Sequence, residues 1–370
     1  MVTYLINNVN DNNTHIHLHM SRGGLGMSLQ QARARPATGV ALPRGITRSG
    51  GVLLCLILLL AIAAISLMLG AKSIPAQGVW HSLSGQLNDA DSTIVLNARL
   101  PRTLAGILVG MALGAAGAVI QALTRNPLAD PGILGVNAGA SFALAVGITL
   151  FGVNGMAGWL GFAWAGALAA SVVVWTIGSL SGGRVNPIRL TLAGVALSAV
   201  LSGLTSSLSL LNPQTLDQLR FWQAGTLDIR SLHNLLLVTP AILVGGVLAL
   251  VAARSLNSLS MGEEMAAALG TRVVLVRVVA LLAVMLLCGS STALVGPIGF
   301  VGLMVPHVAR WWVGADQRWV LIYSSLMAPI LLLSAEILGR FMAAGELRVS
   351  IVTALIGAPV LIWLVRQRRY

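Results

Sequence analysis

The sequence predicts an all-α, polytopic membrane protein with ten transmembrane helices and both termini in the cytoplasm. Of its 370 residues, 56% are hydrophobic and 9% are charged, and the mean hydropathy is +0.86. Soluble domains carry charges on about a quarter of their residues, so this composition excludes a soluble enzyme. A helix needs about 20 mostly apolar residues to cross a bilayer, and such runs recur from residue 51 onward.

Residues 1–50 differ from the rest of the chain, because they are polar and lack an apolar period. We expect a disordered cytoplasmic tail there. His15, His17 and His19 alternate within it, a pattern that a metal site could use, although histidines in an unstructured segment are more often incidental. No metal site is therefore predicted.

The apolar runs predict the ten spans. Because their number is even, both ends of the chain are expected on the same side of the membrane. The spans are placed near residues 51–71, 103–123, 135–152, 158–181, 190–211, 235–253, 275–295, 298–314, 320–341 and 350–366.

Basic residues gather on one side of this arrangement. With the N-terminus inside, sixteen of the 23 Lys and Arg residues fall on the cytoplasmic side and seven on the outer side. Cytoplasmic loops carry an excess of Lys and Arg, so both termini are expected inside. The tail supplies five of the sixteen inner basic residues. Without the tail, eleven basic residues on the inner side against seven on the outer side still favour the same orientation. Nucleic-acid binding is not predicted, because the charges lie between apolar runs and not on one face.

Small and hydroxyl residues distinguish two of the spans. In the second span Gly106, Gly110, Gly114 and Gly117 form a smooth strip, which lets helix backbones approach closely and predicts a packing helix. The fifth span places five hydroxyl side chains on one helix face, which suits a wall facing water or a polar helix. Each hydroxyl can also bond the carbonyl four residues back, so the stripe alone does not establish a pore. The five are Ser198, Ser202, Thr205, Ser206 and Ser209.

Two connections carry helix signals. In the outer loop 212–234, the segment LDQLRFW predicts a short amphipathic helix at the mouth of a pathway. In the inner stretch 255–273, Glu263 and Glu264 precede a run of alanines, and Gly270 is a natural helix stop. We expect a short helix across the inner surface that serves a partner, and a solvated amphipathic loop is the alternative.

Glu336 and Arg340 are charged residues inside the ninth span. They are four residues apart and can pair on one helix face. A gradient-driven, proton-coupled carrier would need an intramembrane acid such as Glu336. The adjacent arginine favours the ionised carboxylate and makes a poor proton shuttle, so gradient-driven transport is the rival class.

No catalytic arrangement and no P-loop is visible. A P-loop needs GxxxxGK[ST], and the single lysine, Lys72, lies in LGAKS without the upstream glycine. Cys55 and Cys288 lie singly in apolar runs and are expected to be small core residues. His307 stands alone in an apolar helix and is expected to pack there. If ATP drives transport, the ATPase is another chain.

Six segments together resemble the permease subunits of bacterial ATP-driven importers for iron-siderophore complexes, haem and cobalamin. They spread over nearly all of the chain after residue 50. The segments are ARLPRTLAGILVG (98–110), QALTRNPLADPGILGVNAGASFA (121–143), LTLAGVALSAVL (190–201), MGEEMAAALG (261–270), VGPIGFVGLMVPHVARWWVGAD (295–316) and GELRVSIVTALIGAPVLIWLV (345–365).

The resemblance implies a ten-helix permease domain over residues 51–370 in the inner membrane, which works by alternating access and carries no cofactor. It implies a second, homologous permease, two copies of a P-loop ATPase that hold ATP and Mg²⁺, and a periplasmic siderophore-binding protein. The path would run along the fifth span, and coupling helices would lie near residues 256–272. The residues that match the coupling pattern are Glu263, Ala266, Leu269 and Gly270.

In members of this family, outward-facing arginines accept glutamates of the binding protein. The matching residues here are Arg99, Arg102 and Arg340. Arginine suits this role, because its planar fork can hold a carboxylate through two hydrogen bonds. As alternatives, Arg99 and Arg102 anchor the second span at the lipid headgroups, and Glu336 occupies Arg340.

Within the family, three stretches look most like one half of a ferric-enterobactin permease. The implied cargo is a ferric siderophore of the catecholate type, and another siderophore, haem or cobalamin is the alternative. A structural or receptor-like subunit that moves nothing is a further rival, which the coupling-like segment disfavours. The three stretches are TIVLNARLPRTLAG, LTRNPLADPGILGVNAGASFA and LDQLRFWQAGTLDIRSLHNL.

Overall fold

The computed structural model describes residues 48–85, 89–179, 187–229, 231–342 and 346–367, and every regular element within them is a helix. The long helices that span the bundle are α1 (Arg48–Met68), α4 (Leu100–Thr124), α5 (Val136–Phe151), α6 (Met156–Ser179), α7 (Pro187–Leu211), α9 (Leu232–Ser260), α11 (Val273–Val295), α12 (Val301–Val313), α13 (Gln317–Met342) and α14 (Val349–Gln367).

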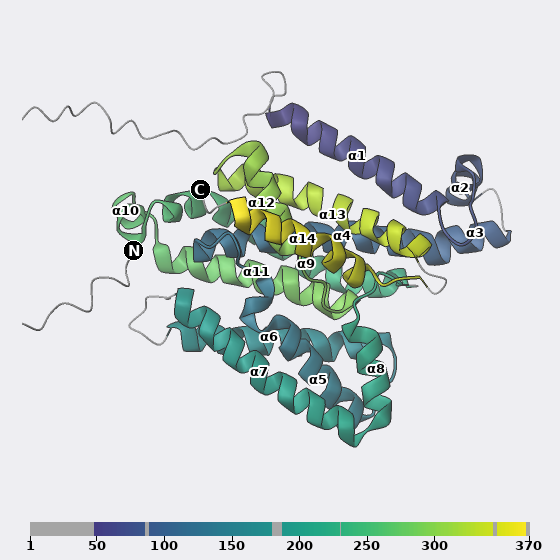
Figure 1. Ribbon diagram of the computed structural model, residues 1–370, viewed down its shortest axis with the longest axis horizontal. Helices are drawn as coiled ribbons and strands as arrows, with labels where there is room; N and C mark the ends of the chain where they lie inside the picture. Colours follow the sequence, from purple (N-terminus) through teal and green to yellow (C-terminus); the bar gives the residue numbers. More distant parts are fainter. Residues whose placement is uncertain (1–47, 86–88, 180–186, 230, 343–345, 368–370) are drawn as a thin grey trace, which may run out of the picture. The chain divides into compact units, whose positions relative to one another are not determined.

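Short helices lie at the ends of the long ones (Figure 1). They are α2 (Ala76–Leu83), α3 (Ala90–Ile94) with a π-helical turn after it (Val95–Arg99), a 3-10 turn (Pro131–Leu134), α8 (Pro213–Gln223) and α10 (Glu263–Ala268).

All ten predicted spans coincide with helices. Seven helical stretches in the described residues are long and apolar enough to cross a membrane, and α5 and α14 contain shorter apolar segments. The all-helical, polytopic membrane fold is therefore confirmed. The predicted tail lies outside the described residues, except that α1 begins at Arg48, three residues before the expected boundary.

Helix α4 is the best-packed helix of the bundle, and it contacts α9, α11, α12 and α13. Its glycine strip explains this. A Cβ atom at Gly114 would overlap the backbone of Ser324 on α13, and one at Gly117 would overlap the carbonyl of Gly302 on α12. Only a bare backbone allows such close approach, so the predicted packing role of these glycines is confirmed.

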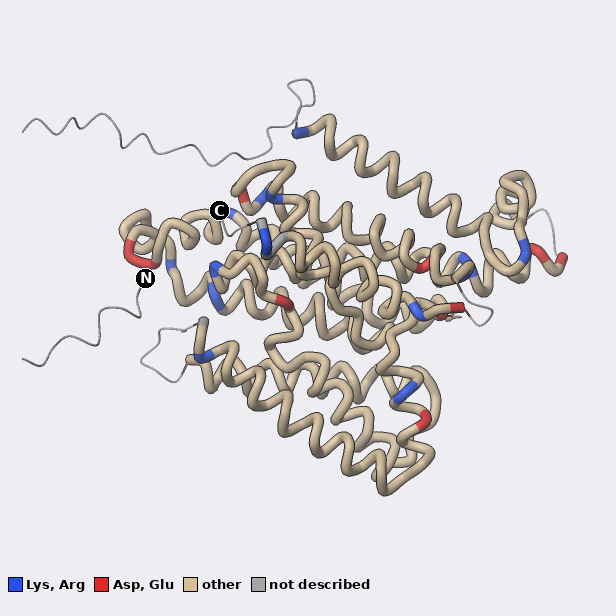
Figure 2. Tube along the Cα trace, viewed as in Figure 1, with Lys and Arg blue, Asp and Glu red and all other residues tan. Residues whose placement is uncertain are grey.

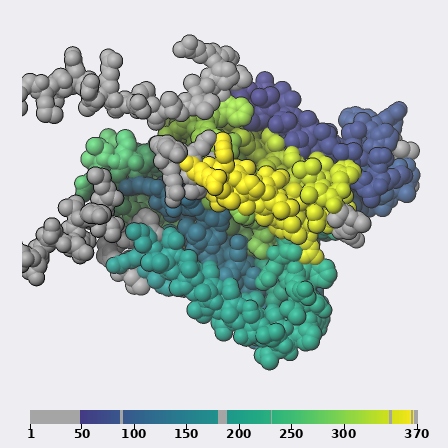
Figure 3. All heavy atoms as spheres, in the orientation of Figure 1, coloured from purple at the N-terminus to yellow at the C-terminus, as the bar shows by residue number. Residues whose placement is uncertain are grey.

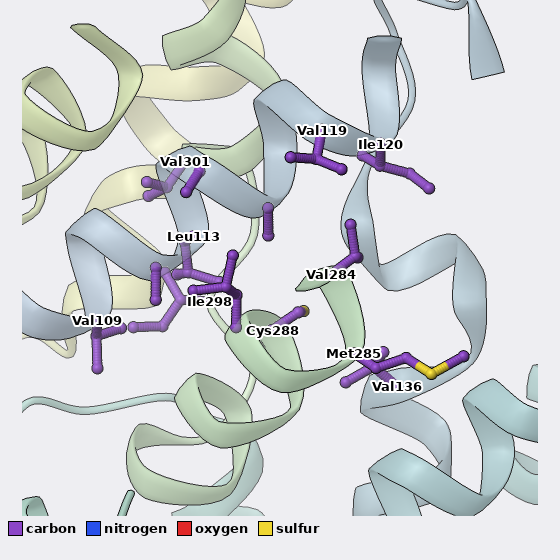
Figure 4. Packing of buried hydrophobic residues seen from close by; sticks show 14 of the residues in the cluster. Val109, Leu113, Val119, Ile120, Val136, Val284, Met285, Cys288, Ile298 and Val301 are labelled. Atoms are coloured by element: carbon purple, nitrogen blue, oxygen red, sulfur yellow. The ribbon is translucent and has the colours of Figure 1, made fainter. Parts of the chain in front are cut away.

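The buried core surrounds α4 and α11 (Figure 4). Val109 and Leu113 of α4 lie in one cluster with Cys288 of α11 and with Ile298, which follows α11. Cys55 and Cys288 are free and buried, as expected of small core residues. The centre of the bundle is therefore filled by apolar side chains.

Helices α5, α6, α7 and α8 form a group that joins the rest mainly through contacts of α6 and α5 with α11 (Figure 1). Most of α7 is exposed, and the teal surface of α7 and α8 is in full view along the lower edge of Figure 3. Most charged residues lie towards the two ends of the helices, with few between them (Figure 2). That distribution is expected for a chain whose middle section lies in lipid.

Candidate functional site

Five charged side chains from four segments meet at the end of the bundle that the sequence places outside, and we call them the outer cluster. Arg102 of α4 is its centre, with Nη2 2.8 Å from Asp228 Oδ1 and Nη1 3.0 Å from Glu346 Oε2. The same Nη1 lies 3.2 Å from Glu336 Oε1 on α13. Arg340 completes the cluster, with Nη2 2.7 Å from Glu336 Oε2. The pairing of Glu336 with Arg340 that the sequence predicted is thus confirmed.

The outer cluster has a buried floor and an open rim. The side chain of Arg340 is 3% exposed and that of Glu336 is 7% exposed, whereas Glu346 is 48% exposed. Buried charges are tolerated when they are paired. In the floor, Glu336 Oε1 accepts hydrogen bonds from Arg102 and Arg340, and Oε2 is ion-paired with Arg340 Nη2. Of the three carboxylates on Arg102, Asp228 and Glu346 are 38% and 48% exposed, so these two are the ones that an incoming group can reach.

Arg99 and Arg340 also bind the C-terminal end of α1. Arg99 Nη1 donates to the carbonyls of Leu67 and Met68 at 2.7 and 2.8 Å. Arg340 Nη1 donates to the carbonyl of Ser66 at 2.8 Å. The last carbonyls of a helix lack partners within it and carry partial negative charge, so two guanidinium groups satisfy and stabilise them. The sequence did not predict this role, because the two arginines and α1 are far apart along the chain.

The three arginines expected to dock a binding protein therefore differ in their surroundings. Arg99 is buried, the side chain of Arg340 is 3% exposed, and both bind the end of α1, whereas Arg102 lies beneath the rim. Two cavities flank the outer cluster. One, of about 380 Å³, is lined by the aromatic residues Trp159, Phe221 and Trp222, and the other, of about 570 Å³, includes Lys72 and Arg99. Arg102 and Arg340 line both cavities, and Arg102 is the more accessible of the two, with 15% of its side chain exposed against 3% for Arg340.

The predicted hydroxyl stripe of α7 is divided in two. Thr205 and Ser209 are buried and donate to the carbonyls four residues back, at 2.7 and 2.8 Å. Ser202 and Ser206 are exposed, and Ser198 is half-buried. Two of the five hydroxyls therefore form hydrogen bonds within their own helix. The other three, Ser198, Ser202 and Ser206, form a separate line in which each follows the last by one helical turn.

The short helix expected in the inner stretch is α10, at the opposite end of the bundle. Ala266 is fully buried, and the carboxylate of Glu263 forms an ion pair with Arg277 of α11. Three large apolar side chains, Met261, Met265 and Leu269, are more than half exposed. Apolar side chains on a polar end of a membrane protein are typical of a contact surface for another protein.

Other polar contacts near this inner end were not predicted. Asn257, near the end of α9, donates to Asp316 Oδ1 at 2.9 Å and accepts from the backbone N–H of Gln317 at 2.7 Å. The hydrogen bond from the Asn257 side chain to the Asp316 carboxylate is the main reason that the pKa of Asp316 lies below its ordinary value. The contact fastens α9 to the start of α13.

Among the described residues, no group of three or more His, Cys, Asp and Glu side chains is placed to hold a metal ion. His15, His17 and His19 lie outside those residues. His307 is buried and packs edge-on against Trp311, with ring centroids 5.2 Å apart.

Comparison with known proteins gives a consistent result. A model of the FecCD transport family matches residues 57–367. The ferric enterobactin transport system permease protein FepD of Escherichia coli (strain K12) is 59% identical over 323 residues, which are 87% of this chain and 97% of FepD. The hemin transport system permease protein HmuU of Yersinia pestis is 37% identical over 86% of this chain and 95% of its own. A solved structure described as an inward-facing metal-chelate type ABC transporter has a TM-score of 0.75 and 29% identity, and the match covers 86% of this chain and 99% of that one.

Proposed function

The chain belongs to the FecCD transport family, and we propose that within this family it carries ferric enterobactin or a closely related catecholate siderophore from periplasm to cytoplasm. It is a multi-pass permease of the inner membrane and part of an ATP-binding-cassette importer. Such permeases have no ATPase site and no cofactor of their own, and a partner ATPase binds the ATP and Mg²⁺.

One observation carries the proposed cargo. Identity is 59% to FepD over nearly its whole length, against 37% to the hemin permease HmuU over a similar span. The two matches cover 87% and 86% of this chain, so a difference in coverage does not account for the difference in identity. A catecholate siderophore is the cargo that this difference supports.

An uptake assay tests the cargo. The chain is expressed in an Escherichia coli strain that lacks FepD, and radioactive iron is supplied as ferric enterobactin, as a ferric hydroxamate or as hemin. We expect restored uptake of ferric enterobactin alone. To separate cargo choice from failed assembly with foreign partners, the same ligands are offered to proteoliposomes that contain the chain with its native partners. Uptake of hemin or hydroxamate, and not of enterobactin, in both assays would contradict the proposal.

We further propose that the ten helices α1, α4, α5, α6, α7, α9, α11, α12, α13 and α14 all cross the membrane, with both termini in the cytoplasm. The excess of basic residues on the inner side supports this topology. In this topology residues 51–370 are the permease domain and residues 1–50 are a cytoplasmic tail. Cysteine labelling from each side of the membrane tests it, with reagent access to the α10 end from the cytoplasm only.

A second, homologous permease is proposed to lie against α7, with the path between the two chains. The exposed face of α7 supports this, because Ser202 and Ser206 on a membrane helix are better placed against water or protein than against lipid. We propose Ser198, Ser202 and Ser206 as the side chains nearest the path, with Thr205 and Ser209 behind them.

The partner proteins are proposed to act at opposite ends. The binding protein docks over the outer cluster, with Arg102 as the principal contact and Arg99 and Arg340 holding the site in place. Two ATPase copies serve the pair of permeases, one on each α10. In this chain Glu263, Ala266, Leu269 and Gly270 are the proposed coupling residues, and the exposed Leu269 is the one best placed to touch the ATPase.

A further inference from the structure

We propose that Arg277 is a positioning residue, which fixes the orientation of α10 through its ion pair with Glu263. The inference rests on the proposed function, because it takes α10 as the element on which the ATPase acts. It adds a residue on α11 that no part of the coupling pattern includes.

A glycine with positive φ stands at each end of α10 and separates it from α9 and α11. Gly262 before it has φ +120° and Gly270 after it has φ +79°, and a Cβ atom at either position would meet no other atom within 4 Å. The requirement for glycine is therefore conformational and not steric. Because the chain turns sharply at both ends, α10 is not a continuation of α9 or α11. Backbone hydrogen bonds from Met261 and Gly262 to Ser258 and Leu259 hold the turn after α9, and side-chain contacts have to supply the rest of the orientation.

The ion pair with Arg277 is a strong contact of this kind. The side chain of Arg277 is 6% exposed, and that of Glu263 is 38% exposed. A buried guanidinium has lost its hydration, so separation from its carboxylate would be costly. Its planar fork also restricts the direction from which the carboxylate can approach. Together with the buried methyl group of Ala266, the pair fixes α10 at two points.

Motion of α10 would pass directly to α11 through this pair. α11 contacts α4, α5, α6 and α9, so it lies between the packed half of the bundle and the group that contains α7 (Figure 1). Met265 of α10, Met261 before it and Leu269 at its C-cap have exposed side chains, which leave a face of this segment available to the ATPase. We infer that a push on that face moves α11 only while Glu263 and Arg277 remain paired.

Spin labelling tests the positioning role without any substrate. Leu269→Cys, at the end of α10, is labelled in the full-length chain in nanodiscs, with Cys55 and Cys288 replaced by alanine. We expect a more mobile label in Glu263→Gln and in Arg277→Gln. The matched control is Glu264→Gln, which removes an exposed acid from the same helix and should leave the label unchanged. The exchange Glu263→Arg with Arg277→Glu should restore low mobility. Equal mobility in all variants would overturn the proposal, as would an exchange that stays mobile.

Transport by the complete complex tests the coupling. In proteoliposomes that contain the ATPase and the loaded binding protein, Arg277→Gln should lower the iron imported per ATP hydrolysed by about fivefold or more, while the ATPase still co-purifies. The charge exchange should recover most of this ratio. An unchanged ratio in a variant with a mobile α10 would contradict the coupling role. If the wild-type complex imports no ferric enterobactin, the proposed cargo fails, and the spin-label result still decides the role of Arg277.

Discussion

Glu336 and Arg340 lie one helical turn apart near the end of α13, and their side chains form the buried ion pair beneath the rest of the outer cluster. Arg340 connects this pair to the carbonyls at the end of α1, and Glu336 connects it to Arg102 on α4. Three helices are thereby joined by two side chains. The cluster is a structural joint as well as the proposed docking site.

Loss of Arg340 should therefore destabilise the protein. Arg340→Ala leaves the carboxylate of Glu336 short of one buried partner and frees the end of α1. We expect the free energy of unfolding to fall by about 3–5 kcal/mol, as in other cases where one partner of a buried pair is removed. Thermal unfolding of the purified chain measures this. Arg220→Ala, at an exposed position, is the control. Equal unfolding temperatures for both variants would refute the claim that Arg340 holds the three helices together.

The rim of the outer cluster should compete with an incoming carboxylate. Asp228 and Glu346 form ion pairs with Arg102 in this structure. Asp228→Asn and Glu346→Gln should therefore each raise the affinity for the binding protein by up to about fivefold, which is the value of an exposed ion pair. Arg102→Ala should weaken it. Asp217→Asn controls for the loss of a negative charge alone, since Asp217 is an exposed residue of α8. Affinity is measured on the chain in nanodiscs, and tightening by Asp217→Asn to the same degree would disprove direct competition.

The two lines of hydroxyls on α7 should behave differently in transport. Ser202→Leu with Ser206→Leu places bulky groups on the exposed face, and we expect slower siderophore uptake with normal assembly. Thr205→Val with Ser209→Ala is the paired control, because those hydroxyls bond their own helix. Normal uptake in the leucine variant would remove this face from the path.

A glycine-to-alanine substitution should change stability in opposite directions at Gly117, which is closely packed, and at Gly203, which is not. Gly117→Ala puts a methyl group onto the carbonyl of Gly302 and should cost about 1–3 kcal/mol of stability. Gly203→Ala on α7 meets no atom within 4 Å and should stabilise the isolated chain by about 0.4–1 kcal/mol, because alanine restricts the unfolded state. The two unfolding temperatures measured in one detergent provide the test, and a neutral Gly117→Ala would contradict the packing account.

The sequence could reveal features that repeat locally. Apolar runs located the ten long helices. The spacing of four residues predicted the pairing of Glu336 with Arg340, and Gly114 and Gly117 marked the packed face of α4. Each of these signals depends on residues within a few turns of one helix.

Contacts across the fold left no such signal. Arg102 meets Asp228 across 126 residues and Glu346 across 244 residues, so only the assembled bundle shows that it is occupied. The division of the hydroxyl stripe was hidden for another reason, because helix period places Thr205 and Ser202 on nearly the same face while packing buries only one of them. Arg277 did offer a clue, since an arginine inside an apolar run needs a partner.

We propose that this permease imports ferric siderophore at the expense of ATP hydrolysed on a partner chain. Replacement of Glu336 tests the gradient-driven rival poorly, because Glu336 also holds Arg102 and Arg340. The direct measurement is uptake of ferric enterobactin into proteoliposomes that contain the chain, its partner permease and the ATPase, with the binding protein outside. We predict uptake with ATP inside and none with a non-hydrolysable analogue, whether or not a proton gradient is imposed. Uptake that follows the proton gradient and needs no ATP would contradict the account.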